Sequence, residues 1–144
     1  MGEDSLSRSV LQQLSDMSVA ISLDDFGTGF ASLNSLTQLN IQTLKIDRSF
    51  AVNLSLSDPR IVILKAIRLM TNGLGIQTVV EGIENVDVAR IVCDLGFDYA
   101  QGYFWSRPID SEAFSKLLAS HGVILVFADL LQVAEPNETR EIRH

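Results

Sequence analysis

Four short apolar segments, each followed by a helical pattern, constrain the fold of this chain more than any other feature of its sequence. They have the length and composition of buried strands, and they are residues 18–23, 42–47, 76–80 and 97–100. Stretches with apolar residues at helical spacing precede, separate and follow them, at residues 5–17, 31–39, 59–73, 85–95 and 111–118. Strands that alternate with helices in this way predict an α/β fold built from parallel β/α units.

Residues that favour helix ends support two of these helices. Asp58 can cap a helix that has Pro59 in its first turn, where no backbone donor is needed, and Gly73 is placed to end that helix. Asn85 can cap the next helix, and Gly96 follows its last apolar residue. The sequence therefore predicts both ends of these two helices.

Chain length limits how much of a barrel such units can form. A content of 47% hydrophobic residues is sufficient for a core. A complete eightfold α/β barrel needs about 250 residues, whereas this chain has 144. The chain can therefore form only part of such a barrel.

Charge and cysteine content exclude several classes of function. With 18 acidic and 11 basic residues the net charge is −7, so we expect no DNA binding through the phosphate backbone. Metal ions can still supply the positive charge needed to act on a phosphodiester. Cys93 is the only cysteine, which excludes a disulfide framework and a cysteine-built zinc site.

The sequence shows no sign of a membrane or secretory segment. No apolar run approaches the roughly 18 residues of a transmembrane helix, and the chain does not open with a signal-peptide pattern. We expect no direct membrane contact and a cytoplasmic location, either alone or as the cytoplasmic part of a membrane-anchored parent.

Polar residues with useful chemistry follow each predicted strand. In order along the chain they are Asp24 and Asp25, Lys45 and Asp47, Glu81 and Glu84, and Gln101. In parallel α/β folds the carboxyl ends of the strands form the edge where ligands bind. Carboxylates at such an edge need a positive partner, and their hard oxygen atoms suit Mg²⁺ or Mn²⁺.

Each of these groups also has a purely structural interpretation. The Asp-Asp-Phe-Gly segment is typical of a turn, Lys45 can extend its ammonium to solvent, and Glu81 can favour the positive end of the next helix. Other residues have simpler interpretations than a functional role. Cys93 is expected in the core, His121 at a helix end, His144 in the tail, and Trp105 in packing. The repetition of the same placement after separate strands favours a functional site.

Four motifs follow one another along the chain: DDFGTGFASL at residues 24–33, LKIDRSF at 44–50, TVVEGIE at 78–84, and QGY followed by SRP at 101–103 and 106–108. Together they make the sequence resemble the EAL domain, a bacterial phosphodiesterase domain that acts on cyclic di-GMP. Val80 stands where alanine is usual in the family. The resemblance covers about residues 5–119.

The resemblance implies a fold, a metal site and a reaction. The fold is a TIM-like barrel with its catalytic groups at the carboxyl ends of the strands. Asp24 and Asp25 resemble ligands of two Mg²⁺ or Mn²⁺ ions. The catalytic residues that the resemblance implies are Lys45, Glu81, Glu84 and Gln101. Lys45 would hydrogen-bond the attacking water or a phosphate oxygen, and Glu81 would act as general base or position the water. The reaction is hydrolysis of cyclic di-GMP to linear pGpG, and the family often forms homodimers.

Three metal ligands of the family are absent from this sequence: the Glu of the Glu-Ala-Leu motif, an Asn and a further Glu from earlier strands. We therefore expect residues 1–121 to be the C-terminal half of an EAL barrel, with a C-terminal extension of unknown role at 122–144. Such a fragment is expected to be inactive alone and to self-associate through its open sheet edges. The alternatives are a non-catalytic EAL-like module that binds cyclic di-GMP or a protein, and an unrelated Mg²⁺-dependent half-barrel.

Overall fold

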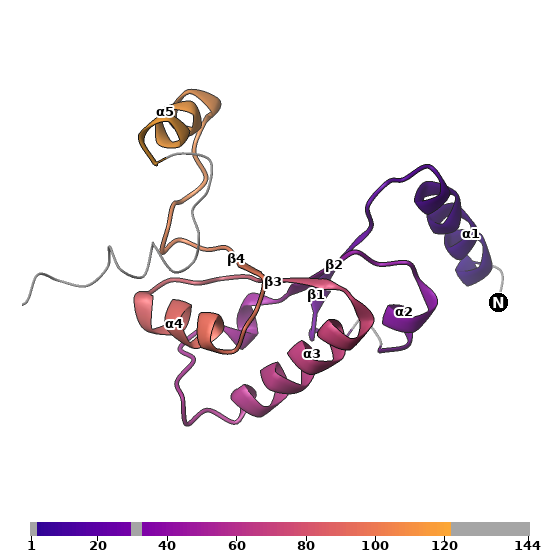
Figure 1. Ribbon diagram of the computed structural model, residues 1–144, viewed down its shortest axis with the longest axis horizontal. Coiled ribbons are helices and arrows are strands. Elements are labelled where there is room, and N and C mark those ends of the chain that lie inside the picture. Colours follow the sequence, from indigo (N-terminus) through magenta and orange to yellow (C-terminus); the bar gives the residue numbers. More distant parts are fainter. Residues whose placement is uncertain (1–2, 30–32, 122–144) are drawn as a thin grey trace, which may run out of the picture.

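One parallel sheet organises the computed structural model, which describes residues 3–29 and 33–121 (Figure 1). Within these residues four strands lie side by side in sequence order, and every neighbouring pair is parallel. The strands are β1 (Ser22–Phe26), β2 (Thr43–Ile46), β3 (Gln77–Val80) and β4 (Tyr99–Ala100). The predicted α/β fold of parallel β/α units is confirmed.

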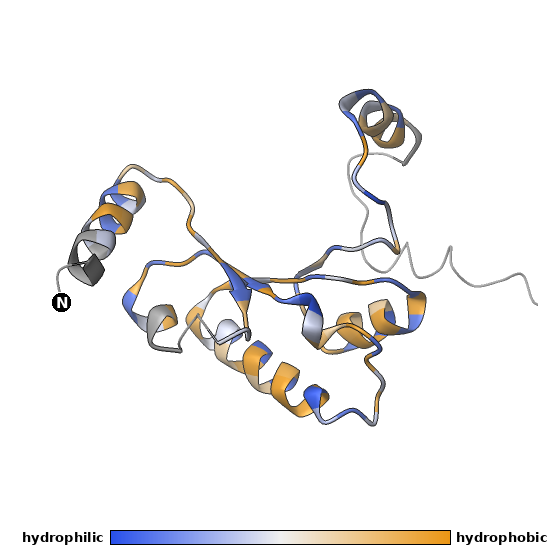
Figure 2. Ribbon diagram, turned by 180° about the vertical axis from the view of Figure 1, so that it is seen from behind, coloured by the Kyte–Doolittle hydropathy of each residue, from blue (hydrophilic) through white to orange (hydrophobic). Residues whose placement is uncertain are grey.

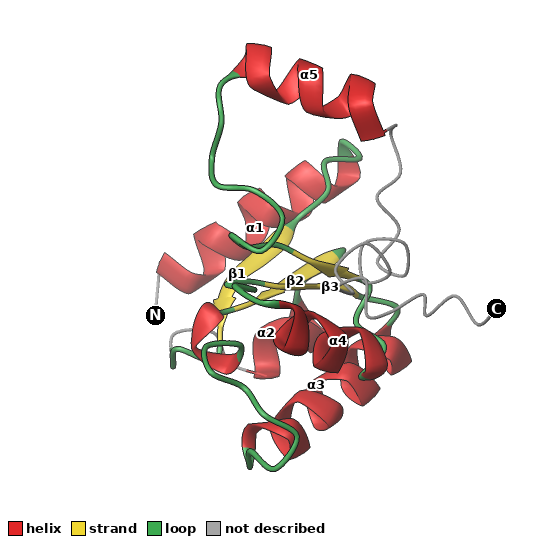
Figure 3. Cartoon of the chain, turned by 90° about the vertical axis from the view of Figure 1, so that its left-hand side faces the viewer, coloured by secondary structure: helices red, strands yellow, loops and turns green. Residues whose placement is uncertain are grey.

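Helices surround the sheet unevenly. They are α1 (Glu3–Asp16), α2 (Leu33–Gln38), α3 (Arg60–Leu74), α4 (Val86–Asp94) and α5 (Ser111–His121), with a short 3-10 helix η1 (Arg48–Phe50) after β2. Figure 3 shows α2, α3 and α4 together on one side of the sheet, whereas α1 and α5 stand apart on the other side. None of the described helices is long and apolar enough to span a membrane.

The hydrophobic core lies between the sheet and the α3–α4 layer. In β2, Leu44 and Ile46 are fully buried, while the alternate residues Thr43 and Lys45 are only half-buried. Leu64 of α3 and Val92 of α4 are also fully buried, and Figure 2 shows that apolar residues dominate both helices. Because side chains alternate along a strand, one face of the sheet is covered and the other carries the polar residues.

The first strand differs from the prediction, which placed it at residues 18–23. Instead, Ser18 has a φ of 62° and forms the left-handed end of α1. Its backbone N–H donates to Ser15 O and the N–H of Val19 donates to Leu14 O, which is the Schellman pattern of a helix end. Since residues 18 and 19 close the helix, the strand begins later, at Ser22, and continues through Asp24 and Asp25.

The predicted helix ends are partly confirmed. Asn85 accepts a hydrogen bond from Val88 N at 3.0 Å and caps α4, and Gly96 follows that helix with a φ of 78°. The predicted end of α3 at Gly73 is wrong. The helix runs through Gly73 to Leu74, and Gly75, with a φ of 69°, ends it. A left-handed φ is what glycine supplies at such an end. The predicted extension at 122–144 lies outside the described residues.

Asp58, at the start of α3, is expected to make the stability of the fold depend on pH in the acid range. Its carboxylate accepts hydrogen bonds from the backbone N–H and the guanidinium of Arg60, and the guanidinium bond lowers the pKa of Asp58 from 3.8 to about 2. A lowered folded-state pKa stabilises the fold above pH ~4, and this contribution is lost as the pH falls toward 2. We expect Asp58→Asn to lower the stability at neutral pH and to flatten this part of the acid dependence. Urea unfolding of the unmodified chain and of the Asp58→Asn variant across this pH range measures the free energy of unfolding of each. The same pH dependence of that free energy in both proteins would contradict this expectation.

Candidate functional site

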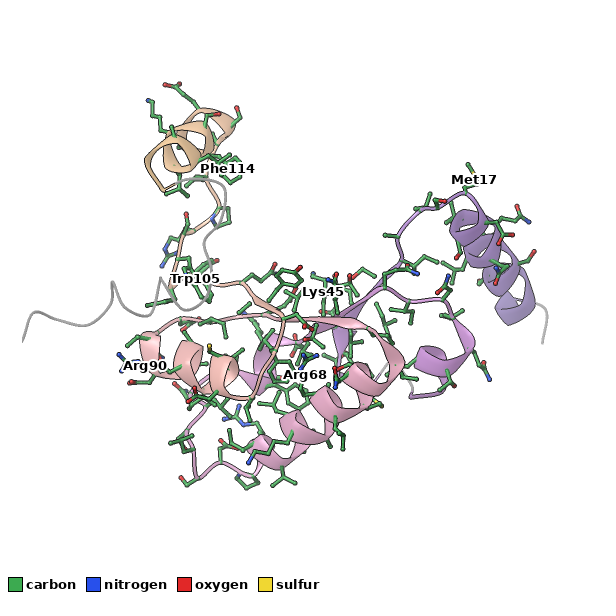
Figure 4. The ribbon with its side chains drawn as sticks, viewed as in Figure 1. Met17, Lys45, Arg68, Arg90, Trp105 and Phe114 are labelled. Atoms are coloured by element: carbon green, nitrogen blue, oxygen red, sulfur yellow. The ribbon has the colours of Figure 1, made fainter. Side chains whose placement is uncertain are left out.

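Lys45 connects two carboxylates at the carboxyl edge of the sheet. Its Nζ lies 3.0 Å from Oδ1 of Asp24 on β1 and 2.5 Å from Oε1 of Glu81, which follows β3. Figure 4 shows Lys45 over the middle of the sheet. The structure therefore brings together three of the predicted site residues from three neighbouring β/α units.

Gln101 extends this cluster to the fourth strand. Its Nε2 donates a hydrogen bond of 2.8 Å to Oε1 of Glu81. Backbone hydrogen bonds fix both residues just beyond their strands, because Glu81 N donates to Ile46 O and Gln101 N donates to Val80 O. The parallel ladder thus continues past the strand ends and places these side chains at one level.

Asp25 joins the cluster because of an irregularity in β1. Leu23 pairs with Leu44 and Phe26 with Ile46, so β1 has one more residue than β2 between these two pairs. Asp25 occupies this bulge with a φ of 53°. In a regular strand Asp24 and Asp25 would point to opposite faces, but a bulge redirects a side chain. Oxygens of Asp24, Asp25 and Glu81 consequently all lie within 4.8 Å of one another.

Because of its backbone conformation, Asp25 is expected to lower the free energy of unfolding while its carboxylate favours Mn²⁺ binding. A positive φ costs a non-glycine residue about 1–2 kcal/mol, although Asp tolerates it better than most. We expect Asp25→Gly to keep or raise the free energy of unfolding while it weakens Mn²⁺ binding. The β-branched control Asp25→Val should lower that free energy. Urea unfolding and Mn²⁺ titration of the three proteins test this, and equal destabilisation by Gly and Val would contradict it.

Electrostatic contacts keep Asp24 and Lys45 ionised near neutral pH. The hydrogen bond from Lys45 lowers the pKa of Asp24 below its usual value. The hydrogen bond to Glu81, followed by the one to Asp24, raises the pKa of Lys45. The first effect stabilises the fold above the ordinary aspartate pKa, and the second stabilises it below the ordinary lysine pKa. Lys45 is therefore a cation, and Asp24 an anion, across the physiological pH range.

The donor set fits a divalent cation. Asp24 and Asp25 are exposed and Glu81 is half-buried, so the oxygens lie at a surface that an ion can reach. Three carboxylates face a single ammonium group, which leaves an excess of negative charge. Hard oxygen ligands of this kind suit Mg²⁺ and Mn²⁺. The predicted ligand pair is thus brought together with a further carboxylate, that of Glu81, for which the sequence indicated a catalytic role.

A cavity of about 540 Å³ adjoins the cluster. Its walls include Glu81 and Gln101 of the cluster, the predicted site residue Glu84, and the basic residues Arg48 and Arg107. The sequence reasoning missed both arginines as site residues, although Arg48 lies within LKIDRSF and Arg107 within SRP. The guanidinium carbon of Arg107 lies 4.5 Å from the ring centre of Tyr103, a cation–π contact. The cavity therefore offers both positive charge and an aromatic surface.

Other strand-end and aromatic residues are structural. Asp47 lies outside the cluster: its carboxylate accepts a hydrogen bond of 2.9 Å from Ser49 N and caps η1. Trp105 packs edge-on against Phe104, with ring centres 5.1 Å apart, in agreement with its predicted packing role. Cys93, predicted as a core residue, is only half-buried on α4.

Gly102 fixes the position of Gln101. A Cβ atom at residue 102 would overlap the backbone of Ile83. Two hydrogen bonds form across this contact, from Ile83 N to Gln101 O at 3.1 Å and from Phe104 N to Ile83 O at 3.0 Å. Only glycine permits this approach, so the Gln-Gly pair is a packing requirement as well as a motif.

Comparison with known proteins identifies the family. The family model described as the EAL domain matches residues 2–108, more than half of the chain. The chain belongs to the EAL domain family. Cyclic di-GMP phosphodiesterase NbdA of Pseudomonas aeruginosa is 34% identical to this EAL chain over 112 residues, which are 78% of this chain and 14% of NbdA.

Solved EAL structures agree with the fold. The EAL domain of Mycobacterium smegmatis DcpA superposes with a TM-score of 0.76 at 34% identity, covering 83% of this chain and 54% of that chain. Klebsiella pneumoniae BlrP1 in a manganese and cyclic di-GMP complex superposes with a TM-score of 0.65 at 29% identity, covering 70% and 26%. The prediction of half of a TIM-like barrel is therefore confirmed. The chain spans 14–18% of the length of the curated relatives that it matches.

Proposed function

We propose that this chain forms part of the active site of a phosphodiesterase that hydrolyses cyclic di-GMP to linear pGpG. The convergence of Asp24, Asp25, Lys45 and Glu81 at one edge of the sheet carries this proposal. The names of two relatives support it, since NbdA is a cyclic di-GMP phosphodiesterase and BlrP1 forms a manganese and cyclic di-GMP complex.

Asp24, Asp25 and Glu81 would hold Mg²⁺ or Mn²⁺. A bound ion of this kind neutralises charge on a phosphoryl group and lowers the pKa of a bound water. Two ions are expected in a complete domain. The sequence of this chain lacks the further ligands of the family, so its own metal binding is expected to be weak.

The residues of the chain have further roles in this proposal, and Glu81 serves both the metal ion and the water. Lys45, whose ammonium the cluster keeps protonated, would donate a hydrogen bond to a phosphate oxygen and stabilise the charge that develops there. Glu81 would accept a proton from the attacking water. The amide of Gln101 holds the Glu81 carboxylate in place. Glu84, on the wall of the adjoining cavity with Arg48 and Arg107, would contribute to substrate binding.

Nucleotide binding that depends on metal tests this function. We expect the purified chain to bind cyclic di-GMP more tightly with Mn²⁺ than with EDTA, and Asp24→Asn to remove the difference. Asp87→Asn, a matched control at an exposed acid on α4, should retain it. Equal binding with Mn²⁺ and EDTA would favour the non-catalytic binding module instead, and no binding in either condition would contradict the proposal.

We also propose that the chain alone has little or no hydrolytic activity, because of the ligands absent from its sequence. Measurement of pGpG formed with Mn²⁺, with NbdA as the active control, tests this, and turnover comparable to that of NbdA would contradict it. Self-association into a homodimer and a cytoplasmic location complete the proposal.

A further inference from the structure

We propose that Asp98 is a positioning residue of the site: its carboxylate fixes the start of β4 and, through that strand, the contact of Gln101 with Glu81. The inference rests on the proposed function, in which Glu81 serves the metal ion and the attacking water. Asp98 lies outside the four sequence motifs, at the opposite end of β4 from Gln101.

The length of β4 makes its position depend on contacts beyond the strand itself. β4 comprises Tyr99 and Ala100, which pair with Val79 and Val80 of β3. Strands in globular proteins usually have three to ten residues, so two residue pairs provide few of the usual ladder hydrogen bonds. The residues on either side of β4 therefore contribute much of what holds it against β3.

Asp98 provides such contacts immediately before the strand. Its Oδ2 accepts hydrogen bonds from Thr78 N at 2.8 Å and from Thr78 Oγ1 at 2.7 Å. The backbone N–H of Asp98 donates to the same Oγ1 at 3.1 Å, and Thr78 is fully buried. These bonds continue the β3–β4 register by one residue pair, with side chains in place of main-chain acceptors.

Arg68 connects the same carboxylate to α3. Its Nη1 lies 3.1 Å from Oδ2 of Asp98 and its Nη2 lies 3.2 Å from Oδ1, a two-point contact. An ionised carboxylate only accepts hydrogen bonds, so its oxygens match the donors of Thr78 and Arg68 without a conflict. One side chain thus joins β3, the start of β4 and α3.

The far end of β4 carries the contact with the site. Gln101 N donates to Val80 O at 2.9 Å, and Gln101 Nε2 donates to Oε1 of Glu81 at 2.8 Å. The three residue steps from Asp98 to Gln101 span about 10 Å of extended chain, which has little slack. A displacement at Asp98 is therefore passed to Gln101. Partners that orient a metal ligand typically change metal affinity or activity about 10–100-fold.

The rival interpretation is that Asp98 only stabilises the fold. In that case the contact between Gly102 and Ile83 is enough to hold Gln101. Loss of the Asp98 contacts would then lower the free energy of unfolding and leave the Gln101 amide where it is.

The side-chain amide signal of Gln101 separates these interpretations without metal or nucleotide. It is assigned in ¹⁵N-labelled chain by its absence from the Gln101→Ala variant. Asp98→Asn removes one acceptor oxygen and introduces a donor among donors. We expect it to move this signal toward that of a solvent-exposed glutamine amide. An unmoved signal in the folded variant would overturn the proposal.

Asp58→Asn is the matched control, because it disrupts the other Asp–Arg pair of α3 away from β4. It should lower the stability and leave the Gln101 signal unchanged. Arg68→Lys keeps the charge but loses the two-point contact, and it should move the signal less than Asp98→Asn. This milder variant provides the same test if Asp98→Asn does not fold.

Nucleotide binding in two backgrounds tests the route of the effect. At saturating Mn²⁺, Asp98→Asn should raise the Kd for cyclic di-GMP about tenfold. In the Gln101→Ala background the same substitution should change it less than about twofold, because the residue through which it acts is gone. Equal effects in both backgrounds would overturn the proposal. Absence of binding by the unmodified chain would contradict the proposed function instead, and the amide signal would still decide the role of Asp98.

Discussion

Replacement of Gly102 by alanine is expected to destabilise the chain by about 1–3 kcal/mol, the range for overpacking a tight contact. The added Cβ would overlap the backbone of Ile83, which no side-chain rotation can relieve. Separation of the two segments would break the hydrogen bonds from Ile83 N to Gln101 O and from Phe104 N to Ile83 O. Gln101 would then move away from Glu81, so the substitution should also weaken Mn²⁺-dependent nucleotide binding.

Gly73 offers a matched control for this substitution. It lies inside α3, is exposed, and a Cβ there would meet no atom within 4 Å. Gly73→Ala should stabilise the chain by up to about 1 kcal/mol, because alanine favours a helix over glycine. Urea unfolding of the three proteins compares these effects. Equal stability of the Gly102→Ala variant and the unmodified chain would show that the Gln-Gly segment is not held as described.

Replacement of Lys45 by methionine is expected to change metal and nucleotide binding in opposite directions. The ammonium lies between Asp24 and Glu81, where it neutralises the carboxylates and repels a divalent cation. Its removal should raise the Mn²⁺ affinity roughly tenfold, since about 1.4 kcal/mol of reduced repulsion corresponds to that factor. Mn²⁺-dependent binding of cyclic di-GMP should fall, because a hydrogen-bond donor to the phosphate is lost.

Lys45→Arg is the control for charge. A guanidinium retains the positive charge, so this variant should not gain Mn²⁺ affinity. Its different shape should still weaken nucleotide binding. Titration calorimetry with Mn²⁺ alone, and then with cyclic di-GMP at saturating Mn²⁺, measures both quantities. A parallel loss of metal and nucleotide binding in Lys45→Met would contradict the separate role assigned to Lys45.

Local patterns predicted most of the fold. Alternating burial in β2, with Leu44 and Ile46 inside, follows from the period of a strand, and Asn85 caps α4 as its residue type indicates. The boundary of β1 could not be predicted in this way. Ser18 and Val19 have residue types common in strands, but they complete the end of α1 through hydrogen bonds to Ser15 and Leu14. Such bonds depend on where the helix ends, which hydrophobic spacing alone does not determine.

The sequence predicted the part of the site that lies at the carboxyl ends of the strands. Lys45, Glu81 and Gln101 meet because the carboxyl ends of parallel strands lie along one edge. The contribution of Asp25 depends on its left-handed backbone and the bulge in β1, whereas strand alternation would have turned it away from Asp24. The cavity residues Arg48 and Arg107 belong to loops that come together only in three dimensions, so sequence spacing gave no direct signal for them.

Paramagnetic broadening by Mn²⁺ tests the metal site most directly, because it detects even weak binding. At substoichiometric Mn²⁺, the amide signals of Asp24, Asp25, Lys45 and Glu81 in ¹⁵N-labelled chain should broaden first. Asp24→Asn and Asp25→Asn should abolish this selectivity, and Asp87→Asn should preserve it. Uniform broadening, or broadening centred on the exposed acids of α4, would contradict a metal site formed by Asp24, Asp25 and Glu81.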